Sequence, residues 1–376
     1  MNIELLSIPT DFRGERCYVH ARGAISPQGF GIITTQKLEL SGCDLFYDIE
    51  LMRTEDGGRS FTSPVVCENL RRRYFPDGSS EVMCDATPHY HKGSGKFILT
   101  GHLAVYDRDG KAPKPPRKRS PTYAVYDEVR GDFSAFRTIE MPDDDIFFSS
   151  GSGCSQIYEE ESGELLIPFY TIPRENYSSG KFHCYGGVMR CSFDGSEIRL
   201  IEMGGLLTVE TPRGFCEPSV TKFGGEYFLA LRNDVTGYLS KSRDGMHYDT
   251  PVELCFDDGE SLGNYNTQQH WLTIGGRLYL VYTRRAGNND HVFRHRAPLF
   301  IAEVDQKTLR VIRATERIAV PERGARLGNF GTQSFSDDLG FVYASEWMQG
   351  DRGLAGCMEH GSDNSIFVAR VEALGE

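Results

Sequence analysis

Four side chains capable of acid–base chemistry or anion binding lie at the edges of short apolar segments: His20, Glu217, Arg232 and His270. An imidazole or a carboxyl group can take a proton from water or give one to a leaving oxygen. A guanidinium group can bind a carboxylate through two parallel hydrogen bonds. We therefore predict that His20, Glu217 and His270 are catalytic and that Arg232 binds an acidic group of the substrate.

Other polar side chains fall at equivalent places beside further apolar segments. A single histidine beside a strand is more often structural, so this prediction depends on the same register recurring along the chain. The residues predicted to bind substrate in addition to Arg232 are Arg22, Lys37, His89, His102, Gln269, Arg284, Arg285 and His291. Tyr170, Asn266 and Asn329 share this register and are expected to face the same end of the fold.

The segment 282–296 is dense in cations and hydrogen-bond donors. Arginine matches the geometry of a carboxylate, so this segment favours an acidic sugar as ligand. A network of ion pairs between neighbouring structural units is the alternative interpretation.

A repeated unit would position all these residues. In each copy a turn that ends in glycine precedes a short apolar strand, and the spacings between copies are 66, 68, 62, 51 and 64 residues. The six glycines are Gly29, Gly95, Gly163, Gly225, Gly276 and Gly340. Each spacing is long enough for four strands and their turns, which is typical of a β-propeller. Six copies predict six blades.

A further strand follows each of these, rich in aromatic and β-branched residues. The six predicted strands are 49–53, 123–126, 187–191, 238–241, 299–304 and 366–371. No segment has a long apolar period of 3.6 residues, so helix should be scarce. The sequence predicts an all-β fold: one domain over residues 1–376, a six-bladed β-propeller with about four antiparallel strands in each blade. Residues 3–8 should pair beside the final strands and close the ring.

Three of these strands run into a turn that combines a hydroxyl, an aspartate and a glycine. The turns are 54–61, 192–195 and 242–248, with Asp56, Asp194 and Asp244 at their centres. Aspartate and serine accept hydrogen bonds from local amides, and glycine takes the positive φ. We expect these aspartates to stabilise outer hairpins far from the chemistry.

These turns resemble the Asp-box of the sialidase (neuraminidase) superfamily, and the resemblance covers nearly the whole chain. It implies a propeller with an arginine triad for the substrate carboxylate, a tyrosine nucleophile assisted by glutamate, and an aspartate acid/base. The run from Glu217 to Arg232, followed by the turn at Ser242, is similar to the family's glutamate and second-arginine segment.

The chain departs from that family pattern at both ends. The family's first arginine motif is replaced by Tyr18-Val-His20-Ala, with Arg22 displaced, and the segment 328–332 has Phe330 where a tyrosine would supply the nucleophile. Phenylalanine has no hydroxyl group and cannot attack an anomeric carbon. The departures put the ordinary sialidase mechanism in doubt.

We expect an exo-glycoside hydrolase that cleaves a terminal bond at a sialic or uronic acid of an oligosaccharide or glycoconjugate. One alternative is a uronate lyase or a rhamnosidase-like propeller, both similar in their use of histidine, tyrosine and arginine. The other is a propeller that binds carbohydrate without catalysis. No cofactor or metal is expected.

The net charge of −12 argues against a broad nucleic-acid surface, and the basic cluster from Lys111 to Arg119 is interpreted as an exposed loop. No run of 18 apolar residues is present, and the first residues lack the basic and apolar regions of a signal peptide. We expect no membrane association and a cytoplasmic location, unless a leader has been removed. Ten cysteines without a CxxC pair are expected to be reduced and buried.

Overall fold

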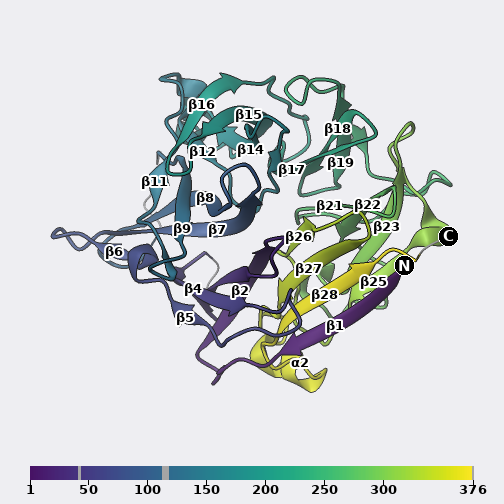
Figure 1. The fold of residues 1–376 in the computed structure, drawn as a ribbon, viewed down its shortest axis with the longest axis horizontal. Coiled ribbons are helices and arrows are strands. Elements are labelled where there is room, and N and C mark those ends of the chain that lie inside the picture. Colours follow the sequence, from purple (N-terminus) through teal and green to yellow (C-terminus); the bar gives the residue numbers. More distant parts are fainter. Residues whose placement is uncertain (41–43, 112–117, 375–376) are drawn as a thin grey trace.

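The computed structural model describes residues 1–40, 44–111 and 118–374. Six antiparallel sheets surround a central axis, and each sheet forms one blade (Figure 1). The predicted all-β, six-bladed propeller is therefore confirmed.

The strands of each blade are given from the axis outward. The first blade contains β2 (Arg16–Ile25), β3 (Gly31–Glu39), β4 (Phe46–Thr54) and β5 (Val65–Val66). The second contains β7 (Ser80–His91), β8 (Lys96–Tyr106) and β9 (Pro121–Asp127), with the short strands β6 (Arg73–Tyr74), β10 (Asp132–Phe133) and β11 (Arg137–Thr138). The third contains β12 (Ser149–Gly151) and β13 (Tyr158–Glu159), both paired with β14 (Leu165–Ile172), then β15 (Tyr185–Phe193) and β16 (Ile198–Met203).

The other three blades follow the same plan. The fourth contains β17 (Cys216–Phe223), β18 (Glu226–Arg232), β19 (Tyr238–Ser242) and β20 (Val252–Glu253). The fifth contains β21 (His270–Ile274), β22 (Arg277–Tyr282) and β23 (Leu299–Asp305), with β24 (Arg310–Val311) and β25 (Arg317–Val320). The sixth contains β26 (Gly331–Ser334), β27 (Leu339–Ser345), β28 (Ile366–Glu372) and the N-terminal strand β1 (Asn2–Ile8).

The N-terminal strand closes the ring as predicted. β1 pairs antiparallel with β28 over seven residue pairs, from Asn2 opposite Glu372 to Ile8 opposite Ile366. β1 and β28 lie side by side in Figure 1. This pairing covers an edge of the last blade that would otherwise expose unpaired backbone groups.

Apolar clusters fill the space between neighbouring blades. Ile98 and Leu99 on β8 are adjacent in sequence, yet Ile98 packs with the third blade and Leu99 with the first. Successive side chains of a strand point to opposite faces, so a strand between two blades is apolar on both faces. The short apolar runs after the repeated glycines are therefore the second strands of the blades.

The aspartate turns lie between the third and fourth strands, on the outer hairpins. Asp56 accepts hydrogen bonds from the amides of Arg59 and Ser60, and Asp244 accepts them from the amides of Met246 and His247. Asp194 accepts hydrogen bonds from the amides of Ser196 and Glu197 and from the hydroxyl of Ser196. These carboxylates stabilise turns, as expected from the sequence.

Helix is scarce among the described residues. There are two short α-helices, α1 (Arg174–Ser178) and α2 (Gly353–Glu359), and four 3₁₀ turns, η1 (Glu68–Leu70), η2 (Asp145–Phe147), η3 (Phe293–His295) and η4 (Arg313–Thr315). None of these helices has the length and apolarity needed to span a membrane. All nine described cysteines are free thiols, and eight are buried, as predicted; Cys43 lies outside the described residues.

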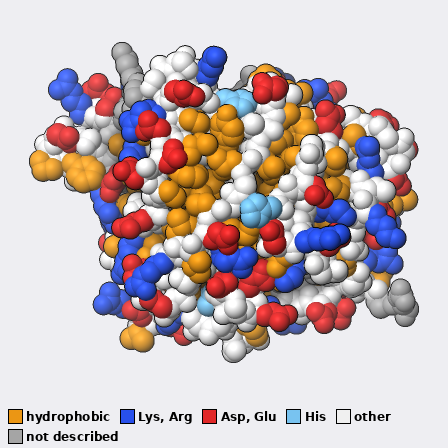
Figure 2. All heavy atoms as spheres, turned by 90° about the horizontal axis from the view of Figure 1, so that it is seen from above, with side chains coloured by type: hydrophobic (Ala, Val, Ile, Leu, Met, Phe, Trp, Pro, Cys, Tyr) orange, Lys and Arg blue, Asp and Glu red, His pale blue; other side chains and the backbone are white. Residues whose placement is uncertain are grey.

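Seen edge-on, one flank of the propeller carries an apolar area bordered by charged side chains (Figure 2).

Candidate active site

Each blade has a non-glycine residue in the left-handed backbone conformation within its innermost strand or in the segment beside it. These residues, with φ from 46° to 71°, are His20, Asp85, Cys154, Glu217, Asn266 and Asn329. In β2, β7 and β17 the residue lies within a break in the strand register. A bulge of this kind changes the direction of a side chain, and positive φ values in non-glycine residues concentrate at functional sites. Because this feature recurs in all six blades, we infer that a functional site lies at one end of the central axis.

A cavity of about 910 Å³ lies at this end, and Asp85, Glu217 and Asn329 are in its wall. We call this cavity the basin. Eight cationic side chains line it, against three carboxylates, in a chain whose net charge is −12. The cations are Lys111, Lys118, Arg119, Arg213, Arg232, Arg294, Arg296 and Arg326; the carboxylates are Asp44, Asp85 and Glu217. A concave surface with this excess of positive charge attracts anions.

Two buried arginines hold one side of the basin. Arg232, the last residue of β18, contacts Oε1 of Glu217 and donates a hydrogen bond of 2.6 Å to Oδ1 of Asn266. Arg296, which follows η3, donates to the backbone oxygen of Asn266. Burial lowers the pKa of Arg296 well below its usual value, and Arg232 and Arg326 add to this effect. A bound anion would relieve the repulsion among these cations.

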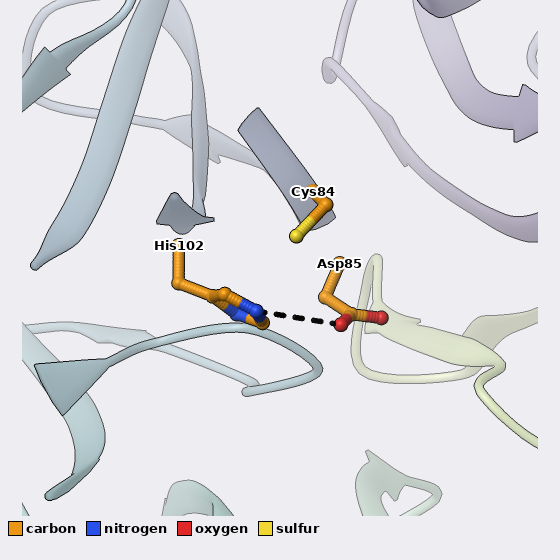
Figure 3. A group of neighbouring side chains, drawn as sticks. All are labelled: Cys84, Asp85 and His102. Atoms are coloured by element: carbon orange, nitrogen blue, oxygen red, sulfur yellow. Dashed lines mark ion pairs between the residues drawn. The ribbon is translucent and has the colours of Figure 1, made fainter. Parts of the chain in front are cut away.

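A chain of polar contacts holds the other side. The hydroxyl of Tyr170 lies 3.4 Å from Nδ1 of His102, and Nε2 of His102 lies 3.8 Å from Oδ2 of Asp85. The other oxygen of Asp85 lies 3.0 Å from Nδ1 of His20. Figure 3 shows the ring of His102 pointing toward the carboxylate of Asp85. These contacts join four ionisable side chains into one network, with one side chain each from β2, β7, β8 and β14.

The protonation states in this network follow from burial and charge. Burial lowers the pKa of His102 to about 4, and Arg119 acts in the same direction. Burial alone would raise the pKa of Asp85, but the facing His20, His102 and Arg22 outweigh it, so the pKa is lowered. Burial raises the pKa of Tyr170 well above its usual value, while Arg119 acts in the opposite direction. At neutral pH this network therefore contains Tyr170 and His102 in their neutral forms and Asp85 as a carboxylate.

Cys84, Asp85 and His102 also form the one group of potential metal ligands found among the described residues (Figure 3). Their ligand atoms lie within 4.8 Å of one another. Asp85, however, already accepts a hydrogen bond from the thiol of Cys154, and burial raises the pKa of Cys84 well above its usual value. A metal needs the thiolate form, and this environment favours the thiol.

Three of the residues predicted to be catalytic or to bind substrate lie in the basin wall: Glu217, Arg232 and His102. Tyr170 and Asn329, which were expected to face the same end of the fold, also line it. His20 is 4% exposed and reaches the basin only through its partners, Asp85 and Asn329, whose side-chain amide is 2.7 Å from Nε2 of His20. His20 therefore contacts two residues of the wall and does not line the basin itself.

Two further predicted residues are buried inside the fold instead. His270 is 1% exposed, bonds through Nδ1 to the hydroxyl of Ser219 at 2.8 Å and packs its ring against Phe330. Gln269 donates to the backbone oxygen of Thr267. The structure does not bring either into the basin; the fifth blade reaches the basin residues Arg232 and Arg296 through Asn266, before β21 begins.

Arg22 is a buried structural residue that connects several blades. It is fully buried and donates to the backbone oxygens of Phe330 and Ala86 and to the sulfur of Cys154. These contacts link the first blade to the second, third and sixth. With its donors turned to these partners, Arg22 does not line the basin.

The remaining predicted binding residues lie elsewhere. Lys37 pairs with Glu50 at 3.2 Å, and His89 lies beside Glu159 in a separate cavity of about 300 Å³. Arg284 pairs with Glu316, Arg285 stacks on the ring of Tyr265, and His291 pairs with Glu322. The Arg284–Glu316 ion pair lies within the fifth blade and not between neighbouring blades, while Arg294 and Arg296 of the same segment line the basin.

Sequence reasoning missed several residues of the wall. The basic cluster from Lys111 to Arg119 was expected to be an exposed loop, but Lys111, Lys118 and Arg119 line the basin, and residues 112–117 lie outside the described residues. Asp85 was missed because it stands in an apolar strand without a flanking signal. The break in the strand register and the positive φ at Asp85 mark it, and both are visible only in the structure.

The fold is similar to solved propellers, although no family model and no curated protein matches the chain. A protein of unknown function from Dyadobacter fermentans has a TM-score of 0.68 at 13% identity, with 99% of both chains covered. A Trypanosoma rangeli sialidase has a TM-score of 0.64 at 12% identity, and a Hadza microbial sialidase has 0.63 at 12%. The match covers 98% and 95% of this chain but only 59% and 66% of those two sialidases. By its fold, this chain is a divergent sialidase-like β-propeller.

Proposed function

We propose that this protein is a glycoside hydrolase that cleaves a terminal bond at an acidic sugar, a sialic or uronic acid. The observation that carries the proposal is the charge of the basin: eight cations face three carboxylates in a protein of net charge −12. Such a local excess of cations, against the charge of the whole chain, matches an anionic ligand. The similarity in fold to sialidases supports the same ligand class.

The substrate carboxylate would bind between Arg232 and Arg296. Both guanidinium groups are at least nine-tenths buried, and among the described residues the Nε atom of each has no hydrogen-bond partner. A buried donor without a partner is costly, and a carboxylate would satisfy it with a charge-assisted hydrogen bond. Water is largely excluded there, so the interaction would be stronger than on an open surface.

Glu217 stands beside this carboxylate site and is the carboxyl group of the wall nearest to Arg232. Its Oε2 atom is buried and has no hydrogen-bond partner among the described residues. In the proposed reaction this oxygen stabilises positive charge that develops at the anomeric carbon. The sugar ring would then extend from the two arginines toward Tyr170 and His102.

A lyase is the second candidate, and the Tyr170–His102 contact favours it. In a lyase the arginines would neutralise the uronate carboxylate, His102 or Tyr170 would take the C5 proton, and the other would protonate the leaving oxygen. The two reactions leave different products, because a lyase forms an unsaturated uronate that absorbs ultraviolet light and a hydrolase does not.

A panel of fluorogenic glycosides tests the proposal. It would contain sialic acid, glucuronic acid and galacturonic acid in both anomeric configurations, each with the neutral sugar of matching ring as control. We expect release of the fluorophore from at least one acidic glycoside and none from its neutral counterpart. Uronate-containing oligosaccharides, in which O4 of the uronate carries the leaving sugar, test the second candidate, and an unsaturated uronate product from them would establish the lyase instead. Binding of acidic sugars without turnover by any member would establish a non-catalytic carbohydrate-binding propeller.

A further inference from the structure

The sixth blade lacks the hydroxyl group that a covalent mechanism of glycoside hydrolysis would need there. Phe330 is fully buried, and its ring packs against His270 at a centroid distance of 5.0 Å. Two described tyrosines line the basin, Tyr106 and Tyr170. The hydroxyl of Tyr106 donates to the backbone oxygen of Asp44 and accepts from the amide of Phe46, so it is committed to holding a loop.

We propose that Tyr170, supplied by the third blade, is the catalytic nucleophile and that His102 takes its proton. The inference rests on the hydrolase function proposed above. It assigns the covalent step to a different blade from the one in which sequence resemblance places it.

The contacts of His102 fix the form of its ring that this role requires. In the proposed arrangement Nε2, which lies 3.8 Å from the carboxylate of Asp85, carries the ring proton, and the lone pair of Nδ1 is directed at the hydroxyl of Tyr170, 3.4 Å away. A nucleophile beside a base that a carboxylate orients is the general arrangement for activating a hydroxyl group. For the proton to transfer, substrate binding would have to shorten the separations of 3.4 and 3.8 Å to hydrogen-bond length.

The backbone of the third blade is shaped around the His102 ring. A Cβ atom at Gly153 would lie 2.1 Å from Nδ1 of His102, and one at Gly151 would lie 3.0 Å from its Cβ. Only glycine leaves room for the imidazole at position 153. The two glycines therefore allow β8 to present His102 to a tyrosine on β14.

Arg119 is the cation that would stabilise negative charge on the oxygen of Tyr170. The guanidinium of Arg119 lies 5.9 Å from the centre of the Tyr170 ring, and its Nε donates to the hydroxyl of Ser149 at 3.2 Å. Because burial disfavours a free phenolate, proton transfer to His102 would accompany attack on the sugar rather than precede it. Arg119 reduces the cost of the negative charge that forms during this step.

The proposed steps balance as follows. The phenolic oxygen of Tyr170 bonds to the anomeric carbon while the glycosidic carbon–oxygen bond breaks. The phenolic proton passes to Nδ1 of His102. The leaving oxygen takes a proton from a carboxyl group of the basin wall, and we assign this role to Asp44. Water then attacks the anomeric carbon and gives a proton to the same carboxylate, the bond to Tyr170 breaks, and the phenolate recovers its proton from His102.

Covalent trapping tests this assignment. An acidic sugar with fluorine beside the anomeric carbon and a good leaving group slows hydrolysis of the covalent intermediate, so the labelled residue can be identified by peptide mass spectrometry. We expect the label on Tyr170. Tyr170→Phe should lower kcat by at least about 10²-fold while the Kd for the acidic sugar product stays within a few fold. Tyr90→Phe, on β7 and outside the basin, is the matched control and should keep full activity.

The possible results distinguish the assignment of the nucleophile from the hydrolase function on which it rests. Turnover by the wild type with a label on another residue, or with Tyr170→Phe as active as Tyr90→Phe, would overturn the nucleophile and leave the hydrolase standing. No turnover by the wild type on any acidic glycoside would overturn both. Gly153→Ala gives a further check, because displacement of His102 should lower kcat more than it raises KM.

Discussion

The Nδ1 atom of His20 lies 3.0 Å from Oδ1 of Asp85, across the boundary between the first and second blades. Both residues have left-handed backbone conformations, and the Nε2 atom of His20 contacts Asn329 of the sixth blade. One imidazole therefore joins three blades at the place where the ring closes. Since Asp85 also faces His102, the position of His20 determines how the carboxylate is presented to the basin.

His20→Ala should lower kcat through Asp85 rather than through a lost proton transfer. The expected loss is smaller than the roughly 10²-fold or more that removal of a general acid or base produces. His20→Asn can still donate a hydrogen bond to Asp85 and should recover part of the loss. Steady-state kinetics of both variants, with melting temperatures, test this. A loss as large as that of His102→Ala, without recovery in His20→Asn, would show that His20 is itself the acid or base.

The stability of the protein should fall as the pH drops from about 6.5 to about 4. Burial lowers the pKa of His102 to about 4 and that of His270 to about 3, and Arg119 and Arg22 respectively act in the same direction. In the unfolded chain both would titrate near 6.5. Below that pH the unfolded state binds more protons than the folded state, so each group reduces the free energy of unfolding by roughly 1.4 kcal/mol per pH unit.

Unfolding by urea at several pH values measures this slope. His270→Asn removes one titrating group and should make the dependence on pH shallower between about 6.5 and 4. The matched control is His291→Asn, because His291 is only partly buried and pairs with Glu322 at the surface. An unchanged slope in His270→Asn would show that this imidazole takes up its proton without unfolding.

The sequence was sufficient to predict the blades because each second strand is apolar on both faces. Ile98 and Leu99 illustrate the reason: neighbouring residues face different blades, so the strand appears as an unbroken apolar run after a glycine turn. The paired edge at β1 also followed from the need to close the ring. Physical requirements that act on every blade leave a repeated signal in the sequence.

The site was only partly predictable because it depends on features that are not periodic. Glu217 and Arg232 stand out as charged residues in apolar strands, and the structure places both in the basin. His270 also stands at the edge of an apolar strand, but Asn266, four residues earlier, is the residue that contacts Arg232 and Arg296 of the basin. Arg296 and Arg326 come from connections of irregular length, whose paths only the folded backbone determines.

Loss of either buried arginine should separate acidic from neutral ligands. Arg296→Met and Arg232→Met each remove a donor from the proposed carboxylate site, which should weaken binding of an acidic sugar by about 10- to 100-fold. Binding of a neutral analogue should change little. Arg284→Met is the control, because Arg284 pairs with Glu316 outside the basin. Calorimetric titration would reject the site if all three variants bind the acidic sugar alike.

The two outer aspartate turns should contribute to stability and not to activity. Asp56→Ala and Asp244→Ala each remove hydrogen bonds to backbone amides, at a cost of about 1–3 kcal/mol in the free energy of unfolding. Both turns lie between the outer strands of their blades, so kcat at a temperature where the variants are folded should match the wild type. Asp143→Ala, an exposed aspartate without such contacts, should change neither quantity. Loss of activity with unchanged stability would contradict this role.

Removal of the N-terminal strand should destabilise the whole ring and expose an edge. Deletion of residues 1–8 takes away seven residue pairs with β28 and the partly buried side chains Ile3, Leu6 and Ile8, which pack on the clusters at both faces of the sixth blade. The uncovered β28 would present unpaired backbone groups to solvent, so the shortened protein should melt at a lower temperature and associate at its new edge. Light scattering and thermal unfolding at several protein concentrations measure both effects. Glu4→Lys, which changes an exposed side chain and leaves the pairing intact, should behave as the wild type. A monomeric deletion variant with unchanged melting temperature would show that β26, β27 and β28 close the propeller without β1.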